Sequence, residues 1–124
     1  MLRIIGVQRN ESPDKEFVLL QNQGSLRINL RGHVLISETA LDGRDLNRSA
    51  HVFSEEVLVP AGMYVLLITG QGEPKWSRTK DGALIYHAYM GREFPVWDRS
   101  EPPLHVLCKQ HSFAEPREPV LVLR

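Results

Sequence analysis

Apolar residues occur along this chain in short runs, and turn-forming residues separate one run from the next. No stretch keeps an i, i+3, i+4, i+7 apolar stripe for three helical turns, because Gly or Pro interrupts first. The pattern therefore predicts strands, at residues 2–7, 17–20, 28–36, 51–53, 57–59, 63–68, 83–89, 104–108 and 120–123. Seven to nine short strands predict an all-β sandwich or barrel, with residues 1–124 as a single domain and loops at 42–49 and 70–82.

Three residues mark places where the chain is expected to turn or bend. Gly62 follows Pro60 and precedes a long apolar run, where a tight turn favours a positive φ. Gly32 lies inside a strand pattern, as expected of a β-bulge or of a close approach of another backbone. Asn22 ends its run and can close a turn by hydrogen bonding to its own backbone.

Composition and charge argue against some classes of function. Hydrophobic residues make up 42% of the 124 residues and charged residues 24%, which is typical of a folded globular domain and not of a disordered tail. The 15 Lys and Arg residues balance the 15 Asp and Glu residues. A dedicated nucleic-acid domain usually carries a basic excess, so the balance argues against that role while leaving a local basic patch open.

The start of the sequence and its cysteine content bear on location. The first apolar run is too short for the core of a secretory signal, and no run approaches the ~20 residues that span a bilayer. The single Cys108 cannot form an internal disulfide. These features predict a cytoplasmic protein with no membrane span, with secretion as the alternative if the sequence is trimmed from a longer one.

Three stretches carry a family resemblance by their order and spacing. Residues 16–22 alternate apolar positions and end in Asn22, residues 30–35 read Leu-Arg-Gly-His-Val-Leu, and residues 51–65 contain Phe53, a spacer, Leu-Val-Pro-Ala-Gly and a hydrophobic strand. These stretches resemble the lamin-tail domain, an immunoglobulin-like β-sandwich. A fourth match, Val-Trp-Asp at residues 96–98, resembles the Trp that this family often carries before its last strands.

The chain also departs from the lamin-tail pattern. His33 stands where the family has Trp, Ser54 stands where a Pro usually follows the Phe, and residues 108–113 replace an Asp/Gly hairpin. The chain is therefore similar to a divergent, bacterial-type member that stands alone. The resemblance implies a non-enzymatic interaction or attachment module, as lamin-tail domains are on animal filament proteins and beside bacterial secreted nucleases or surface proteins.

Candidate chemistry is sparse. The five histidines are His33, His51, His87, His105 and His111, and the tightest cluster joins two of them to Cys108. On a strand Cys108 points away from His105 and His111, and on a helix His111 lies well round the cylinder. We therefore predict no metal site, no cofactor and no catalytic residue, with Cys108 as a small hydrophobic residue at the core edge. A small metallo-hydrolase is the alternative.

Arginine outnumbers lysine by eleven to four, which raises the question of an anion-binding surface. Arg27 and Arg31, four residues apart, are expected on one face of a strand, with Arg44 and Arg48 in the following loop. A second loop carries Lys75, Arg78 and Lys80 around Trp76. Basic and aromatic residues in this arrangement fit base stacking or protein contact, but ordinary solvated charges are the favoured explanation, ahead of a protein partner and then nucleic acid.

Apolar side chains outside the core suggest a protein partner. If Val18 and Leu20 face the core, then Phe17 and Leu19 point outward, for a subunit contact or for cover by another segment. Three further aromatics in irregular stretches either pin a loop to the core or anchor a partner: Trp76, Phe94 and Trp97. The sequence thus favours a protein-interaction or structural module that self-associates or binds a protein, with a nucleic-acid accessory domain as the alternative.

Overall fold

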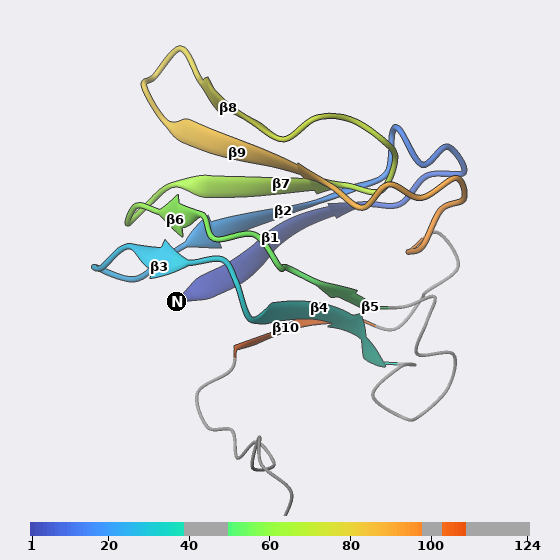
Figure 1. The fold of residues 1–124 in the computed structure, drawn as a ribbon, viewed down its shortest axis with the longest axis horizontal. Helices are drawn as coiled ribbons and strands as arrows, with labels where there is room; N and C mark the ends of the chain where they lie inside the picture. Colours follow the sequence, from blue (N-terminus) through green and yellow to red (C-terminus); the bar gives the residue numbers. More distant parts are fainter. Residues whose placement is uncertain (39–49, 98–102, 109–124) are drawn as a thin grey trace, which may run out of the picture.

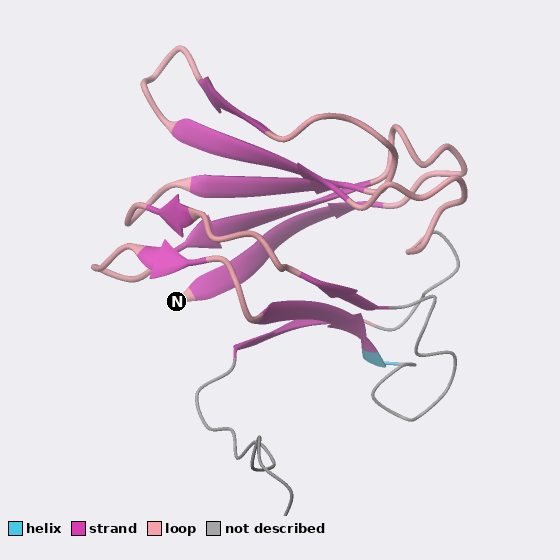
Figure 2. Ribbon diagram, in the orientation of Figure 1, coloured by secondary structure: helices cyan, strands magenta, loops and turns pink. Residues whose placement is uncertain are grey.

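The computed structural model describes residues 1–38, 50–97 and 103–108, and nearly all of the regular structure in this part of the chain is β-strand (Figure 2). None of the described residues forms a helix long and apolar enough to cross a membrane. The strands are β1 (Leu2–Gln8), β2 (Phe17–Asn22), β3 (Ile28–Asn29), β4 (His33–Ser37), β5 (Ala50–Val52), β6 (Leu58–Val59), β7 (Tyr64–Ile68), β8 (Lys75–Arg78), β9 (Leu84–Tyr89) and β10 (Leu104–Cys108).

Two layers make up the fold (Figure 1). One is a five-stranded sheet in the order β1-β2-β7-β9-β8, in which only β7 and β9 run parallel. The other layer consists of the three-stranded sheet β10-β4-β5 and the short pair β3-β6. This arrangement confirms the expected all-β, sandwich-like fold.

The core lies between the two layers, because alternate side chains of each strand face inward. Val18 and Leu20 of β2 and Val65 and Leu67 of β7 are fully buried. Burying one such side chain contributes about 1.5–3 kcal/mol. The second layer and its connections supply further fully buried side chains, among them Leu30, Leu35, Phe53, Val59 and Trp97.

Most of the predicted runs are strands in the structure, with two corrections. The run at 28–36 is divided into β3 and β4, which belong to different sheets, because a turn separates them. The predicted loop at 70–82 contains strand β8, which has only one apolar residue among its four and so shows no apolar run. The predicted loop at 42–49 and the predicted strand at 120–123 lie outside the described residues.

Several strands are joined by turns that contain glycine, and two of these glycines, Gly62 and Gly32, test the predicted positions. Gly62 has a φ of 81°, and the Met63 N–H donates to the Pro60 carbonyl, so the turn predicted there is confirmed. Gly32 has a φ of 89°, and the His33 N–H donates to the Leu30 carbonyl. Gly32 is therefore a turn glycine rather than a bulge, and its N–H donates to the Phe53 carbonyl at 3.0 Å, which confirms the predicted close approach of another backbone. A register shift is found elsewhere, in the five-stranded sheet, where it lies in β1 between residues 4 and 6.

Asn22 closes a turn and also links the two layers. Its side-chain oxygen accepts from the Gly24 N–H at 3.0 Å, which confirms the predicted side-chain-to-backbone turn. Its amide nitrogen donates to the Val59 carbonyl at 3.0 Å and to the Leu26 carbonyl at 2.9 Å. A fully buried amide with partners on both ends holds the end of β2 against β6.

Candidate interaction surfaces

The five-stranded sheet has a second face, directed away from the core, that is also largely apolar. We call it the outer face and define it by the partly buried residues Phe17, Leu19, Tyr64, Leu66, Ile68, Ile85, His87 and Tyr89. The expectation that Val18 and Leu20 face the core while Phe17 and Leu19 point outward is confirmed. Sequence reasoning missed the members of the outer face on β7 and β9.

The strand register places these outer-face side chains next to one another. Leu19 lies opposite Leu66 and Phe17 opposite Ile68 across β2 and β7. Leu66 and Ile68 in turn lie opposite His87 and Tyr89 on β9. Neighbouring side chains on one face of adjacent strands contact each other, so the outer face is continuous across three strands.

Polar residues lie on two sides of the outer face, although the 43% exposed Ile5 also lies on β1. Arg3 lies opposite Gln21 on the β1 side. On the β8 side the Ser77 hydroxyl and the His87 Nε2 are 2.7 Å apart. Partial burial lowers the pKa of His87, and the nearby Lys75 ammonium lowers it further. At one end Gly72 packs against the Tyr89 ring, where any larger side chain would collide.

The aromatic candidates lie in different environments. Trp76 is 42% exposed and lies on β8, with its ring centroid 5.2 Å from that of Tyr86. Phe94 is 76% exposed in the segment after β9. Trp97 is fully buried in the core, so it pins its loop and offers no side chain to a partner.

A buried carboxylate fixes the same loop, and sequence reasoning did not single it out. The Oε1 atom of Glu16 accepts hydrogen bonds from the Thr69 hydroxyl at 2.8 Å, the Val96 N–H at 2.8 Å and the Trp97 N–H at 3.0 Å. Its Oε2 atom is buried without a hydrogen-bond partner among the described residues. Its position in the sequence could have indicated this role, because Glu16 belongs to the series of alternate residues that face the core. The other members of this series are Val18, Leu20 and Asn22.

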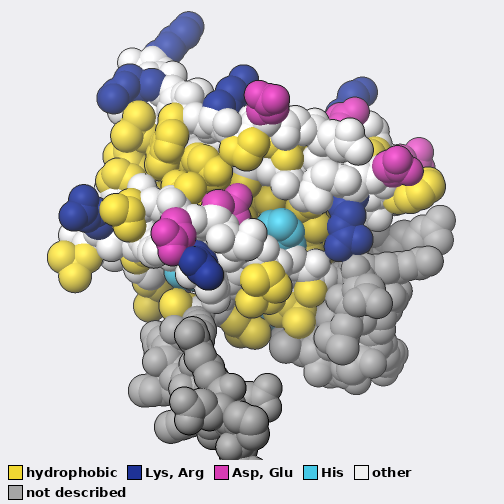
Figure 3. Space-filling model, in the orientation of Figure 1, with side chains coloured by type: hydrophobic (Ala, Val, Ile, Leu, Met, Phe, Trp, Pro, Cys, Tyr) yellow, Lys and Arg dark blue, Asp and Glu magenta, His cyan; other side chains and the backbone are white. Residues whose placement is uncertain are grey.

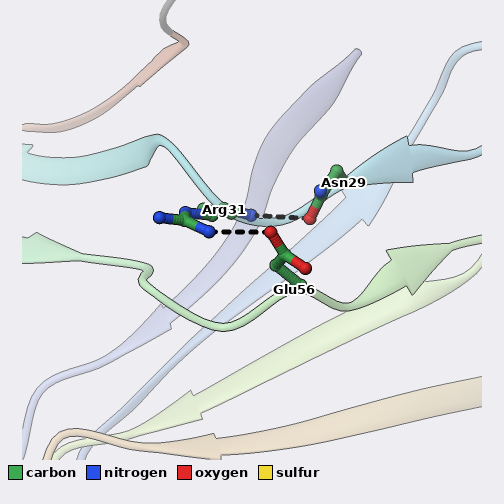
Figure 4. Close-up of polar contacts among 3 residues, drawn as sticks. All are labelled: Asn29, Arg31 and Glu56. Atoms are coloured by element: carbon green, nitrogen blue, oxygen red, sulfur yellow. Dashed lines mark hydrogen bonds and ion pairs between the residues drawn. The ribbon is translucent and has the colours of Figure 1, made fainter.

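The basic candidates do not form one patch. Arg27 and Arg31 flank the two-residue strand β3 instead of sharing a strand face. Arg31 lies in the turn, where its Nη1 is 2.7 Å from Glu56 Oε1 and its N–H donates to Asn29 Oδ1 (Figure 4). Arg44 and Arg48 lie outside the described residues.

The basic residues of the second predicted loop are on or beside β8. Lys75 and Arg78 belong to β8, and Lys80 lies in the turn that follows it. Strand β8 is the edge of the five-stranded sheet, whereas β3 pairs with β6 in the other layer (Figure 1). The structure thus brings together Lys75, Arg78, Lys80 and Trp76, and separates them from Arg27 and Arg31.

The described histidines and the cysteine do not gather in one place, although His33 on β4 and Cys108 on β10 lie opposite each other. Among the described residues no three His, Cys, Asp or Glu side chains are grouped as a metal site would require, and His111 lies outside those residues. His33 is buried with its Nδ1 3.1 Å from the Leu30 carbonyl, and His105 faces Glu38 at 3.4 Å. The prediction that Cys108 fills the core edge is wrong, because Cys108 is exposed at the end of edge strand β10.

His51 has the most distinct electrostatic environment of the described histidines. Its ring packs edge-on against Phe53 at 4.9 Å. Burial lowers the pKa of His51, the Glu55 carboxylate partly offsets this, and the Arg92 guanidinium lowers it further. Burial also raises the pKa of the Tyr86 hydroxyl, and Glu55 raises it again.

Comparisons with known proteins add no relative. No family model matches the chain. No curated protein matches it. No solved structure matches it.

Proposed function

We propose that this protein is a non-enzymatic protein-interaction module of lamin-tail type, and that the outer face of its five-stranded sheet is the binding surface. The observation that carries the proposal is the continuous apolar array across β2, β7 and β9. Large contiguous apolar patches are uncommon on monomers and mark contact sites. The sandwich-like fold and the resemblance at residues 16–22, 30–35 and 51–65 support an immunoglobulin-like module of this kind.

An apolar sheet face that spans three strands suits a protein partner better than a small molecule. Two sheet faces pack about 10 Å apart with interdigitating side chains, and a second copy of the chain offers such a face. The nucleic-acid alternative has less support, because its basic residues lie in separate places and Arg31 is paired with Glu56.

The test introduces a charge on the outer face. Leu19→Lys and Leu66→Lys place an ammonium in the apolar array, and Leu58→Lys makes the same change at a 51% exposed position on β6. Sedimentation velocity over a range of concentrations detects self-association. A tagged pull-down from lysate of the organism that makes the protein, with and without nuclease, detects a partner.

We expect wild type and Leu58→Lys to retain a second copy or a nuclease-resistant protein, and both outer-face variants to lose it. Equal retention by Leu66→Lys would contradict the proposal. Capture that nuclease abolishes would favour the nucleic-acid alternative instead.

A further inference from the structure

A second feature, separate from the outer face, is the free edge of β8. Strand β8 pairs with β9 on one side only and ends the sheet order β1-β2-β7-β9-β8. No described segment runs along its other side (Figure 1). An unpaired edge presents backbone N–H and C=O groups to which another strand can add.

The hydrogen bonds between β8 and β9 show which backbone groups of β8 face away from the sheet. The Thr79 N–H donates to the Ala83 carbonyl at 2.8 Å, and the Ala83 N–H donates to the Thr79 hydroxyl at 3.0 Å, so the Thr79 N–H points toward β9. Residues that point this way alternate along an antiparallel ladder, which directs the backbone of Ser77 and Lys75 toward β9. The N–H and C=O groups of Trp76 and Arg78 therefore point out of the sheet.

The free edge of β8 is short, because a proline precedes the strand and a turn follows it. Pro74 has no N–H and precedes the strand. After the strand the chain turns back, with the Gly82 N–H donating to the Thr79 carbonyl at 3.0 Å. The edge thus accommodates one short extended segment rather than a long strand.

The charged side chains of β8 and its turn determine which kind of strand can pair with this edge. Lys75, Arg78 and Lys80 are exposed, and none of them has an ion-pair partner among the described residues. Lys and Arg side chains also stand beside hydrophobic ones at this corner of the molecule (Figure 3). A second copy of β8 would bring like charges together, which is a common protection of sheet edges. An acidic strand would meet opposite charges.

We infer that β8 is a docking edge for a short, extended acidic segment of a partner protein, which adds to the five-stranded sheet as a sixth strand. Its backbone bonds to Trp76 and Arg78. Side chains directly opposite each other on adjacent strands share a face. The segment therefore places acidic residues opposite Arg78 and Lys75, and an apolar residue opposite Trp76.

The order of residues along β8 allows us to design a peptide that tests this inference. For an antiparallel partner strand we choose Glu, Thr, Val and Glu as the residues that would lie opposite Arg78, Ser77, Trp76 and Lys75. An acetylated and amidated peptide, Ser-Thr-Glu-Thr-Val-Glu-Thr-Ser, carries this core. Titration into the isotope-labelled protein, followed by amide NMR, is expected to shift the Trp76 and Arg78 N–H signals most.

Two methylated peptides separate strand addition from charge attraction alone. N-methylation of the Val removes the amide that faces β8, and N-methylation of the central Thr blocks an amide that points away. We expect the first peptide to lose binding and the second to retain it. Equal binding by both would overturn strand addition, and no binding by the unmodified peptide would overturn the inference.

Charge variants of the protein complete the test. Arg78→Glu is expected to weaken the acidic peptide about tenfold, while Arg27→Glu, the same change beside β3, leaves its affinity unchanged. The Lys-Thr-Val-Lys version of the peptide should bind Arg78→Glu better than wild type. If a thymidine octanucleotide shifts the β8 amides and the acidic peptide does not, the edge binds nucleic acid and the inference is wrong.

This inference does not depend on the outer face. Leu19→Lys, which tests the proposed function, lies on β2 and should leave peptide binding at β8 unchanged. Each proposal can therefore fail while the other holds.

Discussion

The two faces of the five-stranded sheet are built from the same kinds of residue, yet they differ in burial. On the inner face Val18, Leu20, Val65 and Leu67 are fully buried. On the outer face the neighbouring apolar side chains of β2 and β7 are only partly buried. Hydrophobicity alone therefore does not determine which face forms the core, because the second layer covers one face only.

The inner face also shows what a buried position demands of a polar residue. Glu16 and Asn22 lie at the two ends of the inward alternation on β2 and are fully buried. One oxygen of Glu16 accepts three hydrogen bonds, and both ends of the Asn22 amide are bonded. On the outer face Gln21 keeps access to solvent, so it needs no such network.

The largest expected effect is a difference in stability between alanine variants of two adjacent leucines, one on each face of the sheet. Leu67→Ala is expected to lower the free energy of unfolding by about 2–5 kcal/mol, because it leaves a cavity in the core. Leu66→Ala on the outer face should cost about 1 kcal/mol. Urea unfolding measures both. Equal losses would mean that a partner or a second copy covers the outer face, which dilution of the sample would reveal.

The next effect concerns the buried carboxylate. Glu16→Ala removes the acceptor of the Thr69, Val96 and Trp97 donors and should destabilise the protein by about 3 kcal/mol. Glu16→Gln keeps one carbonyl acceptor and should cost less. Thermal unfolding of the two variants tests this order, and a Glu16→Ala loss below about 1 kcal/mol would show that the loop does not depend on the carboxylate.

The smallest effect is a pH dependence. The pKa values of His51 and His87 are lowered in the folded protein, so the unfolded chain, with a His pKa of about 6.5, binds protons first. Stability should be constant above that pH and fall as the pH is lowered through it. Unfolding measured from pH 7.5 to 5 checks the sign, and the His51→Gln/His87→Gln double variant should flatten the curve. A stability that rises on acidification would contradict the assigned directions.

The parts of the fold that depend on local pattern were predictable. Apolar runs located β1, β2, β7 and β9, and a glycine after Pro60 located a turn. Strand β8 was missed because an edge strand with solvent on one side needs no apolar run. Trp97 could be read as a surface or a core residue, since sequence does not show which way a loop folds.

The sequence by itself determined which residues alternate on each strand, and so which side chains share a face. It also located the turn at Gly62, because a positive φ favours glycine. Only the tertiary structure decided that the even-numbered positions of β2 are covered and the odd-numbered ones are not. That choice rests on contacts between residues far apart in the chain, such as Glu16 with Trp97, which no local pattern contains.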